Sequence, residues 1–247
     1  MAARIGMATL RLDKVLCDLG LGSRREVRDW IRAGRVAVDG AVIRTPEQKL
    51  DPAAASVTLD GKPLRYQSYH YFMMDKPEGV ITATEDPKQP TVLDLLPPEL
   101  RRLGLFPVGR LDKDTSGLLL LTDDGDFAHR VTAPKSGVSK RYLAEVEGEP
   151  DADDVSAFSE GLVLGDGAQC LPAGLECLGG NRCIVTVQEG KYHQVKRMLA
   201  SRGKPVLKLR RLSIGALELD DSLGFGGFRE LNEQELCTVF LDRKPKT

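Results

Sequence analysis

The sequence predicts an α+β protein, in which a small module of helices and a hairpin precedes a larger domain with a mixed, mainly antiparallel sheet. Two helical stretches and a hairpin signal lie before residue 65, and strand-like runs cluster after residue 71 instead of alternating regularly with helices. The chain has 247 residues, of which 41% are hydrophobic, so it can bury one sizeable core or two smaller ones.

Two short helices are expected first. Apolar residues between Leu12 and Leu19 recur at the spacing of one helix face, and Gly20 would end that helix. Ser23 and Glu26 have the spacing of a capping box, and the apolar stripe that follows continues to a stop at Gly34. A second helix is therefore expected between Ser23 and Gly34.

A hairpin should follow the second helix. Val36 and Val38 alternate with polar neighbours, Asp39-Gly40 suits a tight turn, and Val42 would begin the return strand. The hairpin completes the small module.

The larger domain is expected to contain buried strands and two helices. Tyr69 to Met74 has the composition of a buried strand, and so do the four leucines at 118–121. Helical patterns lie near 151–160 and near 191–202.

These patterns divide the chain into five segments. We expect a flexible N-terminus at 1–9, the small module at 10–65, a linker at 66–70, the larger domain at 71–242 and a tail at 243–247.

Positive charge is concentrated in two stretches of the sequence. The formal net charge is only -1, but eight basic residues face four acidic ones between Arg4 and Arg35. Most of the basic residues recur at helical intervals and could follow RNA phosphates, although a solvated helix face explains them equally well. The candidate RNA-binding residues of this module are Arg11, Lys14, Arg24, Arg25, Arg28, Arg32 and Arg35.

A second basic run lies between Gly190 and Leu217, with eight Lys or Arg and no acidic residue. Lys191 and Arg197 in this run are further RNA-binding candidates. The alternative is that the cations are merely solvated, because the apolar residues between them have the helical spacing of a core-facing side.

The run GRLDKDTSGLLLLTDDG places Asp112 at the mouth of an apolar strand. Taken alone, such an aspartate is more often a turn residue or cap than a catalyst. Asp112, Asp114, Ser116 and Asp123 also imitate the spacing of a calcium loop, but four leucines replace the ligand-bearing second half of such a loop. Calcium binding is therefore disfavoured.

Several function classes lack a signature. The five cysteines form no CxxC pair, which argues against zinc and a disulfide framework. The sequence contains no GxSxG, P-loop or GxGxxG motif, so neither hydrolytic catalysis nor a nucleotide cofactor is indicated. We expect no metal and no cofactor. No signal peptide or membrane-spanning run is apparent, so a cytoplasmic protein without membrane contact is expected.

Four runs taken together, YFMMDKPEG, GRLDKDTSGLLLLTDDG, KRYLAEVEG and EGKYHQVKRMLA, resemble the pseudouridine synthases that act on ribosomal RNA. The run RLDKVLCDLGLGSRREVRDWIRAGRVAVDG resembles the S4-like RNA-binding domain, which favours RNA binding by the first basic cluster. The likeness covers nearly the whole chain and implies a pseudouridine synthase catalytic domain after an S4-like domain.

The resemblance also implies roles for individual residues. Asp112 matches the essential aspartate, Lys196 the basic residue that pairs with it, and Tyr142 the tyrosine that stacks on the target uracil. Arg110 matches the residue that fills the space left by the extruded nucleotide. Met198 and Leu199 could form the apolar floor of the pocket, although packing in the core explains these two residues equally well.

The implied partner is ribosomal RNA of the small subunit, as free RNA or in an assembling particle, with uridine 516 of the 16S molecule as the target. The alternatives are a synthase acting on 23S ribosomal RNA and a non-catalytic protein of ribosome assembly. We expect a monomer.

Overall fold

The computed structural model describes residues 9–52, 54–64, 66, 69–133 and 135–241. Of the segments expected from the sequence, the tail at 243–247 and all but the last residue of the N-terminus at 1–9 lie outside the described residues, as do two residues of the linker at 66–70.

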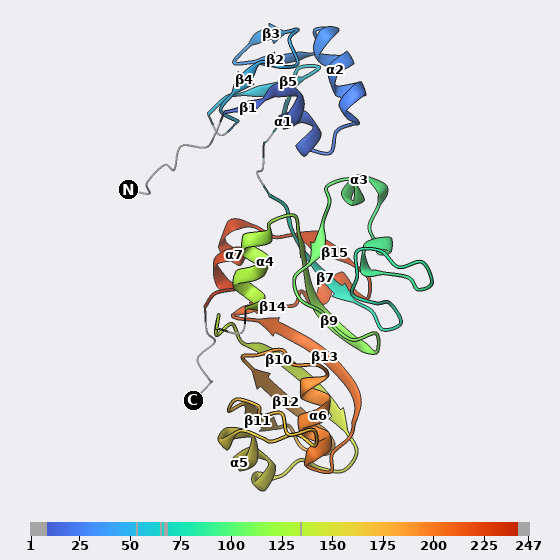
Figure 1. Cartoon of the computed structure of the whole chain (residues 1–247), viewed down its shortest axis with the longest axis vertical. Helices are drawn as coiled ribbons and strands as arrows, with labels where there is room; N and C mark the ends of the chain where they lie inside the picture. Colours follow the sequence, from blue (N-terminus) through green and yellow to red (C-terminus); the bar gives the residue numbers. More distant parts are fainter. Residues whose placement is uncertain (1–8, 53, 65, 67–68, 134, 242–247) are drawn as a thin grey trace. The chain divides into compact units, whose positions relative to one another are not determined.

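The chain forms two compact units (Figure 1). The first contains the chain up to His70 together with Pro97–Gly104, and the second contains Tyr71–Leu96 and the chain from Leu105 onward. The segment Pro97–Gly104, which holds the short helix α3 (Pro98–Arg101), thus groups with the first unit, whereas the division made from sequence assigns it to the larger domain.

In the first unit, the short strand β1 (Leu10–Arg11) is followed by two helices, α1 (Leu12–Asp18) and α2 (Arg24–Arg32), as the sequence predicts for the helices. Ser23 caps α2: its backbone amide donates to Glu26 Oε2 at 2.8 Å, and its hydroxyl accepts from the Glu26 amide at 3.4 Å. The predicted capping box is therefore confirmed. The apolar faces of both helices are buried in one core with residues of the following strands.

A four-stranded antiparallel sheet in the order β3-β2-β5-β6 completes the first unit. Asp39 and Gly40 have φ values of 51° and 82°, the conformation of a tight hairpin turn between β2 and β3. The return strand begins at Ala41, one residue earlier than expected. The strands of this unit are β1 (Leu10–Arg11), β2 (Val36–Val38), β3 (Ala41–Ile43), β4 (Lys49–Leu50), β5 (Val57–Leu59) and β6 (Lys62–Leu64).

The second unit is built on a nine-stranded sheet in the order β11-β12-β10-β13-β9-β7-β15, with β14 paired to β13 and β8 paired to β9 (Figure 1). All pairs are antiparallel except β13 with β9, so the predicted mixed, mainly antiparallel sheet is confirmed. The strands are β7 (Tyr71–Lys76), β8 (Phe106–Pro107), β9 (Thr115–Thr122), β10 (Lys140–Val146), β11 (Gly174–Cys177), β12 (Arg182–Val187), β13 (Val206–Ile214), β14 (Leu217–Glu218) and β15 (Phe228–Glu230).

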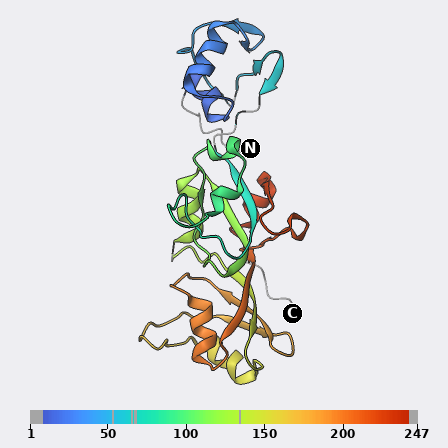
Figure 2. The ribbon, with the colours of Figure 1, turned by 90° about the vertical axis from the view of Figure 1, so that its right-hand side faces the viewer.

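Helices flank this sheet, and the two expected near 151–160 and 191–202 are present as α5 and α6. Figure 2 shows α4 and α6 on the same side of the long strand β13. The helices of this unit are α4 (Gly125–Thr132), α5 (Ala152–Glu160), α6 (Gln194–Ser201) and α7 (Glu233–Thr238), with the 3-10 turns η1 (Val92–Leu95) and η2 (Asp221–Leu223).

Strand β9 crosses the centre of the second unit with all eight residues buried. Gly117 lies against Arg211 on the parallel neighbour β13, and a Cβ at Gly117 would come within 2.2 Å of the Arg211 carbonyl oxygen. Only glycine allows this close approach. The extended strand puts its ends, Thr115 and Thr122, roughly 23 Å apart at ~3.3 Å per residue. Asp112 and Asp123 therefore flank opposite ends of the strand, which does not fit a calcium site containing both.

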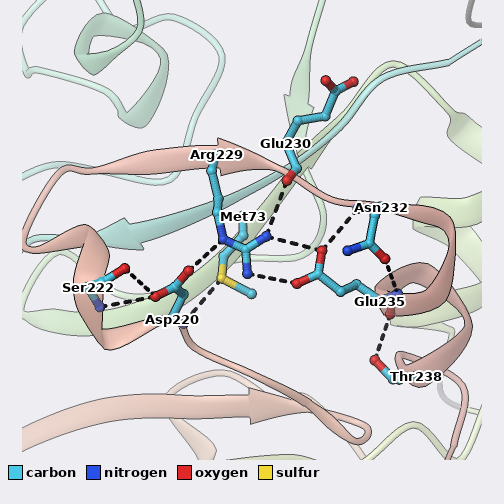
Figure 3. A network of polar contacts seen from close by, with 8 residues as sticks. All are labelled: Met73, Asp220, Ser222, Arg229, Glu230, Asn232, Glu235 and Thr238. Carbon is cyan, nitrogen blue, oxygen red and sulfur yellow. Dashed lines mark hydrogen bonds and ion pairs between the residues drawn. The ribbon is translucent and has the colours of Figure 1, made fainter.

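A polar network fixes the C-terminal part of the second unit (Figure 3). Arg229 on β15 donates to Asp220 at 2.6 Å and to Glu235 of α7 at 2.7 Å. Glu235 in turn forms a capping box with Asn232 at the start of α7. The network connects η2, β15 and α7. Strand β15 is the edge strand of the sheet and pairs with β7.

Candidate active site

The carboxylate of Asp112 lies in the loop just before β9 and contacts two side chains from the start of α6. Its Oδ2 is 3.0 Å from Lys196 Nζ, and its Oδ1 is 3.3 Å from His193 Nε2. The Asp112 side chain keeps 29% of its surface exposed, so a substrate can reach it.

Lys196 bridges two carboxylates. Its ammonium also donates to Asp114 Oδ1 at 2.6 Å. Burial opposes the charge on Lys196, but the hydrogen bonds to Asp114 and Asp112 outweigh burial and raise the pKa of this lysine. The same hydrogen bond lowers the pKa of Asp114. Lys196 is therefore a permanent positive charge at neutral pH beside Asp112.

The loop before α6 is held by its own side chains. Gln194 donates to Glu189 at 2.8 Å and accepts from the Lys191 amide at 2.9 Å. His193 adopts a left-handed conformation with φ 48°, and its ring stacks on Tyr192 with centroids 3.9 Å apart. These contacts direct the His193 ring toward Asp112.

A buried lysine forms hydrogen bonds with the backbone of the Asp112 loop. Lys76, the last residue of β7, has no exposed surface, and its ammonium donates to the carbonyls of Pro77, Asp112 and Thr115 at 2.9, 3.0 and 2.9 Å. Burial lowers its pKa to about 8. The neighbouring carbonyl of Leu111 accepts a hydrogen bond from buried Thr82 at 2.6 Å. The backbone around Asp112 is thus fixed by side chains.

Two adjoining cavities, of about 100 and 680 Å³, open at this site. Asp112, Tyr142 and Arg110 line both of them. Tyr142 lies on β10 opposite Arg211 of β13, whose Nη1 is 3.5 Å from the Tyr142 hydroxyl and whose guanidinium carbon is 6.0 Å from the ring centroid. The cavities therefore place an acid, an aromatic ring and several cations around one space.

The structure brings together the three residues that the resemblance singles out, Asp112, Lys196 and Tyr142. Arg110 is exposed at the rim and has no ion pair with another described residue. Met198 and Leu199 are instead buried in the core under α6 and do not line either cavity, because they lie on the helix face that packs on the sheet. The apolar lining of the smaller cavity comes from Leu111, Val187, Val195 and Leu209.

The RNA-binding candidates differ in their partners. Arg11 and Arg28 both pair with Asp13 and Glu47. Arg24 and Arg25 have no ion pair with another described residue. The remaining pairs are Lys14 with Asp18, Arg32 with Asp29, Arg35 with Asp60, Lys191 with Glu189 and Arg197 with Asp166.

Sequence reasoning missed four residues of this site: Lys76, Lys140, His193 and Arg211. Lys140 could have been found, because it lies two residues before Tyr142 on a strand and therefore shares its face. The other three gave no local signal of their positions.

Across the described ranges, no three His, Cys, Asp or Glu side chains gather closely enough to hold a metal ion. No described helix has the length and apolar composition needed to cross a membrane.

Comparison with protein families identifies two regions. Residues 70–201 match the RNA pseudouridylate synthase family, and residues 10–55 match the S4 domain. The first region contains Asp112, Tyr142 and Lys196.

Relatives match over nearly the whole chain. The proteins named ribosomal small subunit pseudouridine synthase A from Salmonella typhimurium and Escherichia coli K12 are 44% and 42% identical, with 93% of this chain and 100% of each relative covered. A Bacillus subtilis protein named an uncharacterized RNA pseudouridine synthase is 45% identical over 92% of this chain and 97% of its own. A crystal structure of a pseudouridylate synthase is 34% identical, covers 93% of this chain and 99% of its own, and has a TM-score of 0.66.

Proposed function

The chain belongs to the RNA pseudouridylate synthase family, and from this we propose that it isomerises a uridine of small-subunit ribosomal RNA to pseudouridine. The observation that carries the proposal is the Asp112 carboxylate, paired with Lys196 at 3.0 Å and lining the same cavities as Tyr142. The names of the relatives support the small subunit as the source of the substrate. The proposed target is uridine 516 of 16S ribosomal RNA.

Asp112 is the proposed catalytic residue. The isomerisation breaks the bond between N1 and C1′, rotates the uracil, joins C5 to C1′ and transfers the C5 proton to N1. A carboxylate can assist by attacking the sugar, by attacking the base or by helping to form a glycal, and each route requires its charged form. The Lys196 ammonium, 3.0 Å from Asp112 Oδ2, balances that charge, and both side chains line the smaller cavity.

The cavity suits a base that must detach and reattach without escaping. We assign Tyr142 to stacking on the uracil and accepting the C5 proton, and Arg110, exposed at the rim, to the space left in the RNA by the extruded nucleotide. Met198 and Leu199 are proposed to contribute to the pocket floor only indirectly, by supporting the helix that carries Lys196.

The S4-like unit, proposed to span residues 10–65, would hold the RNA while the domain at 71–242 carries out the isomerisation. Arg24 and Arg25 are its best phosphate ligands, because no described carboxylate neutralises them. We further propose that the protein acts as a cytoplasmic monomer on RNA that is free or partly assembled into particles.

A map of pseudouridine in ribosomal RNA from cells with and without this protein tests the proposal. Loss of one modified position in the small subunit is the expected result. Loss of a position in 23S ribosomal RNA would instead favour the other subunit, and an unchanged map would favour the non-catalytic assembly role. In vitro, tritium release from uridine labelled at C5 is the matching assay, since pseudouridine and uridine have the same mass.

A further inference from the structure

Besides Lys113, which donates to Gln89 at 2.9 Å, two cations line the part of the larger cavity that the smaller cavity does not share. Lys140 begins β10, and Arg211 lies on the neighbouring strand β13. Val131 and Thr132 of α4 and Ile214 line the same region. Neither cation forms an ion pair with a described carboxylate.

Arg211 is buried with 4% of its surface exposed, yet its hydrogen-bonding capacity is only partly used. Its Nε donates to the Leu118 carbonyl at 2.7 Å, and its Nη1 reaches the Tyr142 hydroxyl at 3.5 Å. Its Nη2 is buried without a hydrogen-bond partner among the described residues. A buried guanidinium with an unused donor and no counter-charge is costly, which indicates that an acceptor is supplied from outside.

Lys140 also has few hydrogen-bond acceptors and no counter-charge among the described residues. Within the described part of the chain, its ammonium reaches only the Val131 carbonyl, at the long distance of 3.4 Å. Burial and then the positive charge of Arg211 lower the pKa of Lys140 to about 8, so the two cations repel each other. A bound anion would relieve both the repulsion and the missing hydrogen bonds.

The position of these cations relative to Tyr142 points to a particular anion. Lys140 and Tyr142 are alternate residues on one face of β10, roughly 7 Å apart, and Arg211 lies opposite Tyr142 on β13. A base that stacks on Tyr142 would therefore bring its own backbone phosphate close to both cations.

We propose that Lys140 and Arg211 form a phosphate-binding subsite that holds the backbone phosphate next to the extruded uridine. This inference rests on the proposed function, because it takes RNA as the substrate. The subsite would fix the nucleotide through its charge, whereas Asp112 and Tyr142 act on its sugar and base.

The test places one neutral methylphosphonate in an RNA stem-loop, at the phosphate on the 5′ or on the 3′ side of the target uridine. The full-length protein is compared with Lys140→Met and with Lys208→Met, a control on an exposed lysine of β13 that lines neither cavity. Because the substitution is made in the RNA, the proposal stays testable even if the protein variants fold poorly. Melting curves check their folding.

One of the two methylphosphonates should weaken binding of the unaltered protein by about tenfold, as expected for the loss of a charge-assisted contact. Lys140→Met should bind unmodified RNA about tenfold more weakly and lose its sensitivity to that methylphosphonate. Lys208→Met should behave like the unaltered protein. The slope of log affinity against log salt should fall by about 0.7 in Lys140→Met.

Equal binding of both methylphosphonate RNAs and the unmodified RNA would overturn the subsite, as would undiminished sensitivity in Lys140→Met. Tritium release by the unaltered protein, measured on the same unmodified RNA, reports on the proposed function separately. Release without methylphosphonate sensitivity rejects the subsite alone. Methylphosphonate sensitivity without release rejects the proposed catalysis and retains the phosphate contact.

Discussion

The ammonium of Lys76, which has no exposed surface, donates a hydrogen bond to the backbone carbonyl of Asp112 at 3.0 Å. The contact lies on the backbone side of the residue, so the carboxylate remains free for Lys196 and for the cavity. A buried charge is costly unless it is hydrogen-bonded, and here two of the three carbonyl partners, Asp112 and Thr115, belong to the loop that carries the carboxylate, while the third is Pro77. The position of the proposed catalytic carboxylate thus depends on a residue that never meets the substrate.

Replacing Lys76 with methionine should therefore affect both stability and rate. Loss of the ammonium leaves three carbonyls without this donor, which should cost about 1–3 kcal/mol of unfolding free energy. A displaced Asp112 should lower kcat by roughly a hundredfold with little change in KM. Urea unfolding and tritium release measure the two effects, with exposed Lys62→Met as the control. A folded variant with unaltered kcat would show that Lys76 does not position Asp112.

Asp112→Asn should abolish isomerisation while RNA binding stays largely intact. The amide keeps the shape of the side chain but cannot act as an anionic catalyst, so tritium release should fall by at least about a thousandfold. Glu160→Gln removes a carboxylate at the end of α5, which lines neither cavity, and should retain full activity. Full activity of Asp112→Asn would reject the proposed catalytic role.

Lys196 allows a graded test of the counter-charge. Lys196→Met leaves Asp112 and Asp114 without their shared ammonium, and we expect kcat to fall by roughly ten- to a hundredfold. Lys196→Arg keeps the charge but changes the geometry from one ammonium to a planar fork, so it should retain more activity than the methionine variant. Equal losses in both variants would indicate that shape, and not charge, matters at this position.

Asp154 should make the second unit sensitive to acid. Its side chain is buried and accepts from Arg202 at 2.9 Å. Burial favours the neutral form, but hydrogen bonds from Arg202 and from the Asp151 amide outweigh burial and lower the pKa of Asp154 below the ordinary value of 3.8. A carboxyl group with a lowered folded-state pKa stabilises the protein above its unfolded-state pKa, and this contribution is lost as the pH falls below about 4.

At pH 7, Asp154→Asn should therefore lower the free energy of unfolding by about 2 kcal/mol, after allowance for solvent screening at Arg202. The difference from the unaltered protein should narrow in urea unfolding below pH 4. Asp153→Asn, an exposed neighbour on α5, provides the control and should change stability little. A constant difference across this pH range would contradict the assignment.

The unpaired arginines of α2 should dominate the salt dependence of RNA binding. Arg24 and Arg25 have no described ion-pair partner, whereas Arg35 is held by Asp60 at 2.5 Å. The double variant with alanine at both positions should reduce the slope of log affinity against log salt by about 1.5. Arg35→Ala should change that slope less, because Asp60 already neutralises its charge. A larger effect from Arg35 would show that RNA displaces Asp60.

The local elements of this fold follow from the sequence, because the signals that define them act within a few residues. The Ser23–Glu26 capping box, the Asp39-Gly40 turn and the apolar strand after Asp112 were all predicted and are all present. The resemblance of the motifs also singled out Asp112, Tyr142 and Lys196, although their site roles stay predictions.

Apart from the pairing of Asp112 with Lys196, which the resemblance implies, only the tertiary structure decided which side chains contact one another. The register of β10 with β13 sets Arg211 opposite Tyr142, and the end of β7 places Lys76 under Asp112. The tertiary structure also places Met198 in the core and pairs Arg28 with the carboxylate of Glu47. Helix and turn signals depend on neighbours in the chain, whereas a strand finds its partner through packing over long sequence separations. The sequence could therefore identify Asp112 as the acid but not Lys76 as the residue that holds its backbone in place.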